Sequence, residues 1–80
     1  MKFVYYSAEW CLPCGRVWPW VQRAAEKVGA DVEKVDVNND GVTGILSVPT
    51  LDIIVGGETL KRIVRWSGPK ALAREIEELL

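Results

Sequence analysis

The two cysteines of this 80-residue chain are separated by only two residues, in the segment Trp10-Cys11-Leu12-Pro13-Cys14. A strand-like run precedes this segment and a helical pattern follows it, so we expect the pair at the N-terminus of a helix. The free backbone N–H groups and the positive dipole end at this position stabilise a thiolate. A second cysteine within reach closes a short disulfide with the first. The spacing therefore predicts thiol–disulfide exchange.

Two other uses of a cysteine pair fit this sequence less well. A structural zinc site needs four Cys or His ligands, whereas the chain has two cysteines, no histidine and no second pair. Metal binding would require ligands from another molecule, and we expect no metal site. A structural disulfide across so short a loop removes little entropy from the unfolded chain, and an intracellular compartment keeps such a pair reduced.

Length and composition limit the class of protein. We expect a single domain over residues 1–80, with 49% hydrophobic and 26% charged residues as in ordinary globular proteins. The N-terminus runs directly into a strand pattern, without a signal peptide or membrane span, so we expect a cytoplasmic protein with no membrane partner. The formal net charge of −1 and the scattered basic residues argue against a nucleic-acid partner.

Hydrophobic patterning predicts the elements that hold the cysteines. Lys2–Tyr6 is rich in strand formers, and apolar residues recur every three or four positions from about residue 11 to residue 28. Gly29 is the expected C-cap of this helix, and Pro19 inside it predicts a kink. Asp31–Val37 alternates apolar and charged residues at crossover distance, so we expect a parallel strand and a βαβ unit.

A turn and a short helix are expected in the middle of the chain. The run Asn38-Asn39-Asp40-Gly41 is rich in turn formers. Either Asn39 or Asp40 is suited to cap a short helix that extends through Leu46. This helix would connect the βαβ unit to the second half of the chain.

The second half is expected to contain a hairpin and a last helix. Pro49 precedes a strand over Thr50–Val55, and Gly56-Gly57 turns the chain into a strand from about Thr59 to Arg65. Ser67 or Gly68 caps the last helix, which has Pro69 in its first turn. The apolar stripe of that helix is formed by Leu72, Ile76, Leu79 and Leu80.

This order of elements, with the cysteine pair at the first strand–helix junction, resembles the thioredoxin fold along the whole chain. The segment Ala8–Cys14 resembles the thioredoxin active-site segment, with Leu12 where glycine is usual. Pro19 falls where thioredoxins have a helix-kinking proline, and Val48-Pro49-Thr50 resembles their loop with a cis-proline that faces the cysteines. The resemblance implies an α/β fold with a four-stranded mixed sheet of order 2-1-3-4, flanked by helices, and a cis Val48-Pro49 bond.

Three departures from the superfamily bear on function. The chain is shorter than ordinary thioredoxins, without a counterpart of their first strand and helix, and in this it is similar to glutaredoxins. Where thioredoxins have a buried aspartate beneath the second cysteine this sequence has Tyr5, and Lys34 and Asp36 are the other candidates for assisting proton transfer. Where glutaredoxins bind glutathione through a Gly-Gly-x-Asp loop, the chain has Trp66-Ser67-Gly68-Pro69. This run resembles the small redoxins that reduce ribonucleotide reductase.

The resemblance implies a protein-disulfide reductase with no cofactor beyond its own disulfide. From their positions, Cys11 is the expected nucleophile and Cys14 the resolving thiol. Thioredoxin reductase is the expected electron donor, disulfide-containing proteins such as ribonucleotide reductase are the expected substrates, and the chain is expected to be a monomer. Trp18 and Trp20 are expected to be packing residues. The expected substrate-binding rim consists of Trp10, Leu12, Pro13, Val48, Pro49, Trp66, Ser67 and Gly68.

Three other functions are left open by the sequence. The chain could be a glutathione-dependent glutaredoxin, an accessory binding subunit that does not need its thiols, or a cluster-binding protein that shares Cys11 across a dimer. Comparing electron donors tests the first. Replacing both cysteines by serine tests the second, because a binding role survives that change, and visible absorbance of the purified protein tests the third.

Overall fold

A computed structural model describes residues 1–38, 44, 45, 47–64, 66 and 68–79 of the chain. These residues form six helices and strands, joined by loops and turns. They are β1 (Lys2–Ser7), α1 (Leu12–Val28), β2 (Asp31–Asp36), β3 (Thr50–Val55), β4 (Glu58–Val64) and α2 (Pro69–Glu77). These bounds confirm the four expected strands and the first helix to within about a residue at each end. The last helix begins at Pro69 as expected, but it ends at Glu77, before Leu79 of the expected apolar stripe. The short helix expected through Leu46, with its cap at Asn39 or Asp40, lies outside the described residues.

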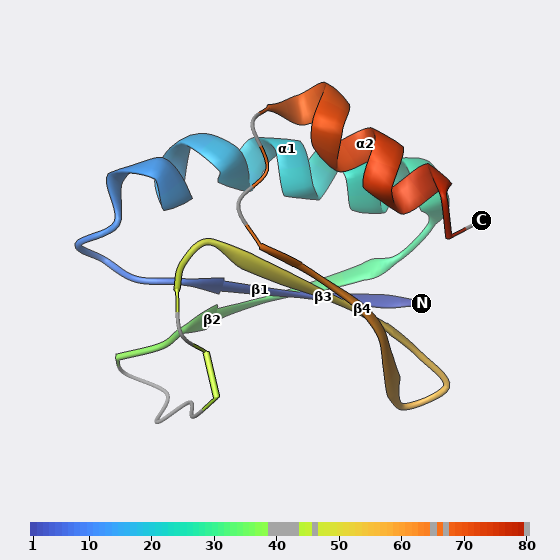
Figure 1. Cartoon of the computed structure of the whole chain (residues 1–80), viewed down its shortest axis with the longest axis horizontal. Helices are drawn as coiled ribbons and strands as arrows, with labels where there is room; N and C mark the ends of the chain where they lie inside the picture. Colours follow the sequence, from blue (N-terminus) through green and yellow to red (C-terminus); the bar gives the residue numbers. More distant parts are fainter. Residues whose placement is uncertain (39–43, 46, 65, 67, 80) are drawn as a thin grey trace.

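The strands form one mixed sheet in the order β2-β1-β3-β4, as the sequence predicts. β1 pairs in parallel with β2 and antiparallel with β3, and β3 pairs antiparallel with β4. Figure 1 shows α1 and α2 side by side on the same face of this sheet. Neither of these two described helices has the length and apolar character needed to cross a membrane.

The core lies between the two helices and the sheet. Phe3 and Tyr5 of β1 are fully buried, as are their register partners Ile53 and Leu51 on β3. The helices add Cys14, Val17, Val21 and Ala25 from α1 and Leu72 and Ile76 from α2. Leu79 packs against this core from its edge, whereas Leu80, the last residue of the expected stripe, lies outside the described residues.

Glycine and proline set the C-terminus of α1 and the N-terminus of α2. Gly29 follows α1 with a φ of 70°, and its backbone N–H bonds back to the last turn. This confirms the expected left-handed C-cap, which glycine adopts at little cost. Gly68 is the N-cap of α2 and Pro69 begins the helix. Ser67, the other cap candidate, lies outside the described residues.

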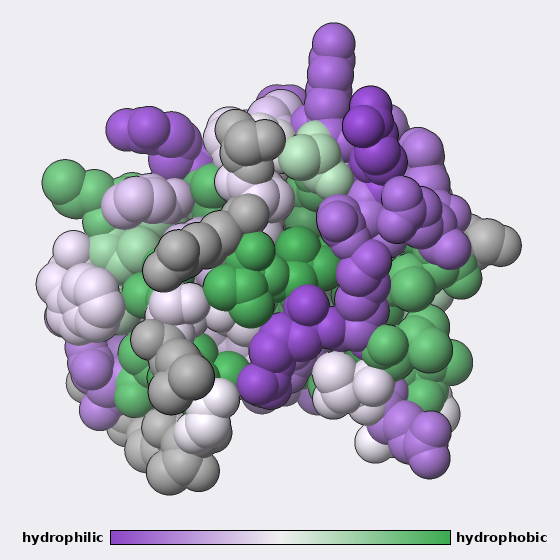
Figure 2. Space-filling view, in the orientation of Figure 1, coloured by the Kyte–Doolittle hydropathy of each residue, from purple (hydrophilic) through white to green (hydrophobic). Residues whose placement is uncertain are grey.

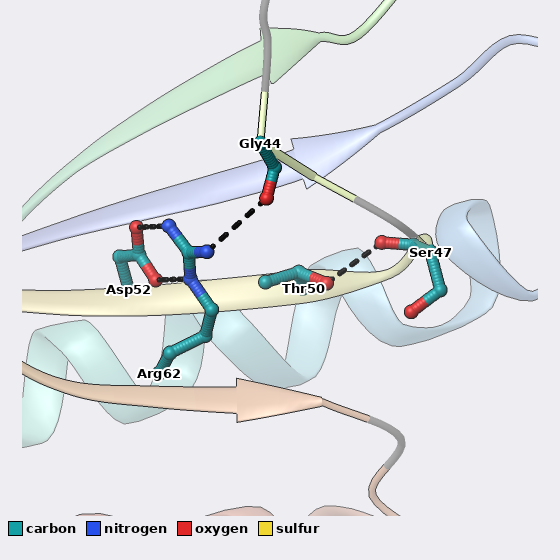
Figure 3. Close-up of polar contacts among 5 residues, drawn as sticks. All are labelled: Gly44, Ser47, Thr50, Asp52 and Arg62. Carbon is teal, nitrogen blue, oxygen red and sulfur yellow. Dashed lines mark hydrogen bonds and ion pairs between the residues drawn. The ribbon is translucent and has the colours of Figure 1, made fainter.

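The sheet face opposite the helices contains an ion pair with a buried carboxylate (Figure 3). Asp52 of β3 is 2% exposed, and Arg62 of β4 is its register partner. Arg62 donates two hydrogen bonds to the Asp52 carboxylate, from Nε at 2.7 Å and from Nη2 at 2.9 Å. Its Nη1 also donates to the carbonyl oxygen of Gly44 at 3.4 Å. The pair therefore ties the two hairpin strands to the segment that precedes them.

Candidate active site

The cysteine pair lies where the sequence predicts, at the N-terminus of α1. Cys11 is the N-cap of the helix and has an extended backbone, and Cys14 is in the first helical turn. The two cysteines form a disulfide with a Cα–Cα distance of 5.3 Å, which is in the usual range for such a bond. The N-cap and first turn of α1 therefore hold both cysteines of the disulfide, and no other element contributes a sulfur to it.

The backbone around Cys11 favours a negative charge on its sulfur. The N–H of Cys14 points at Cys11, and it lies 3.2 Å from Sγ and 3.2 Å from the carbonyl oxygen. The first turn of α1 contains no acidic residue, so the positive end of the helix dipole is not offset there. A thiolate at Cys11 would keep this N–H donor and the dipole after the disulfide opens.

Cys11 is the more accessible of the two cysteines. Its exposed fraction is 9%, compared with 3% for Cys14. The residues on either side of Cys11 are far more open, with Trp10 at 68% and Leu12 at 83% exposure. Figure 2 shows hydrophobic side chains exposed at the left edge of the molecule, over the start of α1. An approaching partner would meet this apolar surface first.

The loop before β3 has the expected cis-proline. The Val48-Pro49 peptide bond is cis, which confirms the prediction. Val48 packs against the core cluster that contains both cysteines. Thr50, almost fully buried, donates its hydroxyl to the carbonyl oxygen of Ser47 at 2.8 Å and so anchors the loop to β3 (Figure 3). Pro13, another residue expected at the rim, is exposed in the first turn of α1.

The remaining rim residues lie between β4 and α2. Trp66 is half-buried and packs against the core. Its indole Nε1 is buried and has no hydrogen-bond acceptor among the described residues. Trp66 therefore contributes to packing, whatever it adds to the rim. Gly68 is half-buried, and Ser67 lies outside the described residues.

Tyr5 lies directly beneath the active-site turn. It is fully buried, and its hydroxyl donates to the carbonyl oxygen of Cys14 at 2.6 Å. Burial raises the pKa of Tyr5 to about 12. The phenol is thus a neutral hydrogen-bond donor at neutral pH.

Tyr5 stacks on Trp18 of α1, and Lys34 of β2 lies over the Trp18 ring. The rings of Tyr5 and Trp18 are nearly parallel, with centroids 5.2 Å apart and an interplanar angle of 20°. The Lys34 Nζ lies 5.2 Å from the centroid of the Trp18 ring, a cation–π distance. Trp18 and Trp20 both pack against the core, as expected. Sequence reasoning missed the stack. Two features of the sequence could have indicated this stack: Trp18 follows Cys14 by one helical turn, and Lys34 is on the strand expected beside that of Tyr5.

Two hollows beside Glu9 bring this residue together with polar residues of β2 and of the segment that follows it. One, of about 330 Å³, is lined by Glu9, Trp10, Asp36 and Asn38. The other, of about 210 Å³, is lined by Ser7, Ala8, Glu9, Lys34 and Asp36. The Asp36 carboxylate accepts a hydrogen bond from the backbone N–H of Asn38 at 2.9 Å. Glu9 and Asp36 therefore place acidic groups at the edge of the active-site loop.

Comparisons with known proteins agree with this geometry. Residues 1–78 match the family described as Thioredoxin. The chain is 35% identical over 83 residues to thioredoxin of Mycobacterium tuberculosis, covering 96% of this chain and 72% of the relative. It is 31% identical to the bifunctional thioredoxin reductase/thioredoxin of Mycobacterium leprae, covering 96% of this chain and 18% of that protein. The structure of thioredoxin 1 from Thermosipho africanus superposes with a TM-score of 0.86 at 25% identity, covering 99% of this chain and 93% of the other.

Proposed function

The chain belongs to the thioredoxin family and is a thiol–disulfide oxidoreductase with Cys11 and Cys14 as its redox pair, and we propose that it works as a reductase of protein disulfides in which Cys11 is the nucleophile and Cys14 the resolving thiol. The observation that carries this proposal is the position of the Cys11 sulfur. It caps the helix, accepts the Cys14 N–H at 3.2 Å, and lies between two exposed apolar residues, whereas Cys14 is 3% exposed.

The proposed reaction has two exchange steps. The Cys11 thiolate attacks one sulfur of the partner disulfide, forms a mixed disulfide and releases one partner thiolate, which takes up a proton. The Cys14 thiol loses its proton and attacks the Cys11 sulfur. This closes the Cys11–Cys14 disulfide and releases the second partner thiolate. The partner gains two electrons, and a reductase must return two electrons to the chain.

The proposal includes a low reduction potential for the Cys11–Cys14 couple. The helix dipole, the Cys14 N–H and the basic side chain of Arg16 favour the Cys11 thiolate, whereas the acidic side chain of Glu9 opposes it. No histidine is present in the chain to stabilise the thiolate further. These modest effects resemble those of the reducing members of the superfamily. The reference among them is thioredoxin, with a reduction potential of about −270 mV.

Thioredoxin reductase is the proposed electron donor. The segment Trp66-Ser67-Gly68-Pro69 replaces the acidic glutathione loop of glutaredoxins. The Mycobacterium leprae relative is named as a reductase and a thioredoxin in one protein, which supports pairing this chain with such a flavoenzyme. The proposed substrates are disulfide-containing proteins, ribonucleotide reductase among them. A monomer consisting of one domain over residues 1–80, in the reducing cytoplasm, suits this role.

A donor assay tests the proposal. The oxidised protein is mixed with NADPH and either thioredoxin reductase or glutathione plus glutathione reductase, together with a protein-disulfide substrate. We expect NADPH oxidation with thioredoxin reductase only, and none when both Cys11 and Cys14 are replaced by serine. Turnover with glutathione alone would contradict the proposed donor. Turnover by the double-serine variant would contradict the role of the cysteine pair.

A further inference from the structure

The backbone of Cys14 is held on both sides. Its N–H, in the peptide plane before the residue, donates to Cys11 Sγ at 3.2 Å. Its carbonyl, in the peptide plane after the residue, accepts the Tyr5 hydroxyl at 2.6 Å. These two planes together fix the direction of the Cα–Cβ bond, so only rotation about that one bond is left to place the Cys14 sulfur. The contact of the N–H with Sγ depends on the Cys11 sulfur, whereas its contact with the Cys11 carbonyl oxygen at 3.2 Å and the Tyr5 contact do not.

Tyr5 itself is held in one orientation. Its side chain is fully buried and stacks on Trp18, with ring centroids 5.2 Å apart. Trp18 follows Cys14 by one turn of α1, and the Lys34 ammonium lies over its ring at 5.2 Å. Lys34 is the register partner of Tyr5 on β2. The hydroxyl is therefore supported by the sheet and by the helix that it bonds to.

Tyr5 remains a donor under all conditions in which the thiols react. An unperturbed thiol titrates near about pH 8.5, whereas burial raises the pKa of Tyr5 to about 12. The phenol keeps its proton while Cys14 loses its own. Its contact is also to a carbonyl oxygen, which has no proton to give.

We propose that Tyr5 is a positioning residue for Cys14: its hydrogen bond to the Cys14 carbonyl aims the resolving sulfur at Cys11, and Tyr5 takes no part in proton transfer. This inference rests on the proposed role of Cys14 as the resolving thiol. While the mixed disulfide exists, the Cys11 sulfur is bonded to the partner. The Tyr5 contact does not involve that sulfur, so it continues to restrain Cys14 in the mixed disulfide.

The experiment separates the two exchange steps with an aromatic disulfide, 5,5′-dithiobis(2-nitrobenzoate). The reduced protein releases one coloured thiolate when Cys11 attacks and a second when Cys14 resolves the mixed disulfide. The first phase depends on reagent concentration and the second does not, so stopped-flow absorbance resolves both. The test variant is Tyr5→Phe, which keeps the ring and its stack. The matched control is Tyr6→Phe, the same change on the next residue of β1, whose side chain lies near Asp52.

We expect Tyr5→Phe to slow the second phase about fivefold, the factor that the loss of one net buried hydrogen bond corresponds to. The first phase should be unchanged. The reduction potential should rise by about 20 mV, which is that factor converted at about 30 mV per tenfold change. The pH profile of the second phase should be lower at every pH with the same midpoint. Tyr6→Phe should match the unmodified protein in all four measurements.

A second phase and a potential equal to those of Tyr6→Phe would overturn the proposal, and a shifted midpoint would assign Tyr5 to proton transfer instead. If Tyr5→Phe fails to fold, as thermal unfolding would show, Trp18→Leu replaces it. That variant removes the ring that orients the Tyr5 hydroxyl, so it should slow the second phase as well, and an unchanged second phase would again contradict the proposal. Cys14→Ser tests the proposed function separately, because it should release only one coloured thiolate whatever the role of Tyr5.

Discussion

Tyr5 and Tyr6 are neighbours on β1, yet they belong to two different environments. Tyr5 faces the helices, is fully buried and bonds to the active-site backbone. Tyr6 faces the other side of the sheet, where burial and the negative charge of Asp52 raise its pKa. The helix-covered face therefore supports the redox site, while the opposite face is held by an ion pair. Substitutions on the opposite face should change stability alone, whereas those on the helix-covered face should change stability, activity or both.

The largest expected effect comes from the apolar face. Phe3 is fully buried between β1 and the helices, so Phe3→Ala should reduce the free energy of unfolding by about 4 kcal/mol, the usual cost of such a cavity. Ile54, which pairs with Lys2 and faces the other side of the sheet, is only half-buried. Ile54→Ala should cost about 1 kcal/mol. Urea unfolding of the two variants measures both values, and equal costs would contradict the difference between the faces.

The ion pair on the opposite face should respond asymmetrically. Arg62→Leu leaves the buried Asp52 carboxylate without its counter-charge and should cost about 3 kcal/mol. Asp52→Asn leaves a guanidinium whose side chain is 45% exposed, so water can solvate it and the cost should be smaller. Urea unfolding compares the two. The second phase of disulfide exchange should be unchanged in both variants, and a slowed phase would show that this face also acts on the redox site.

Ionisation of Tyr5 at alkaline pH should destabilise the folded protein. Its pKa is raised to about 12 in the folded protein, whereas an unfolded tyrosine titrates near about pH 10. Stability from this group is therefore complete below about pH 10 and is lost as the pH rises towards 12, in total roughly 2–3 kcal/mol. Denaturant unfolding between these pH values measures the loss. Tyr5→Phe should show a shallower decline, and a decline as steep as in the unmodified protein would contradict the assignment.

The smallest expected effect concerns Trp66, at the end of β4. If it contributes a docking anchor, Trp66→Ala should raise the KM for thioredoxin reductase up to about thirtyfold, which corresponds to about 2 kcal/mol. Because Trp66 also packs against the core, the thermal midpoint must be measured with it. A large drop in the midpoint with an unchanged KM would assign the residue to packing alone. The control is Leu60→Ala, a change at an exposed residue of β4, the strand that precedes Trp66.

The sequence predicts the parts of this molecule that depend on local pattern. The cysteine spacing indicates the redox pair, period-two and helical patterns indicate the elements, and the Val48-Pro49 motif indicates the cis bond through its resemblance to thioredoxins. Contacts between side chains distant in the chain are not encoded in such patterns. The Tyr5 hydroxyl meets the Cys14 carbonyl only after β1 and α1 have packed together.

The buried carboxylate shows the same limit. Asp52 interrupts the apolar run of β3, and a period-two pattern would place it on a solvated face. The structure buries it because Arg62 is its register partner on β4, and register follows from the whole hairpin. The alternation of a strand therefore predicts which side of the sheet a charged residue is on, but its partner across the sheet decides whether its side chain is buried.

The most direct test of the central claim, that Cys11 attacks and Cys14 resolves, is mass spectrometry of the two single-serine variants after incubation with a protein-disulfide substrate. Cys14→Ser should accumulate a covalent adduct with the substrate, because the mixed disulfide forms and cannot be resolved. Cys11→Ser should form none. Adducts on Cys11→Ser together with their absence from Cys14→Ser would contradict the assignment of the two sulfurs.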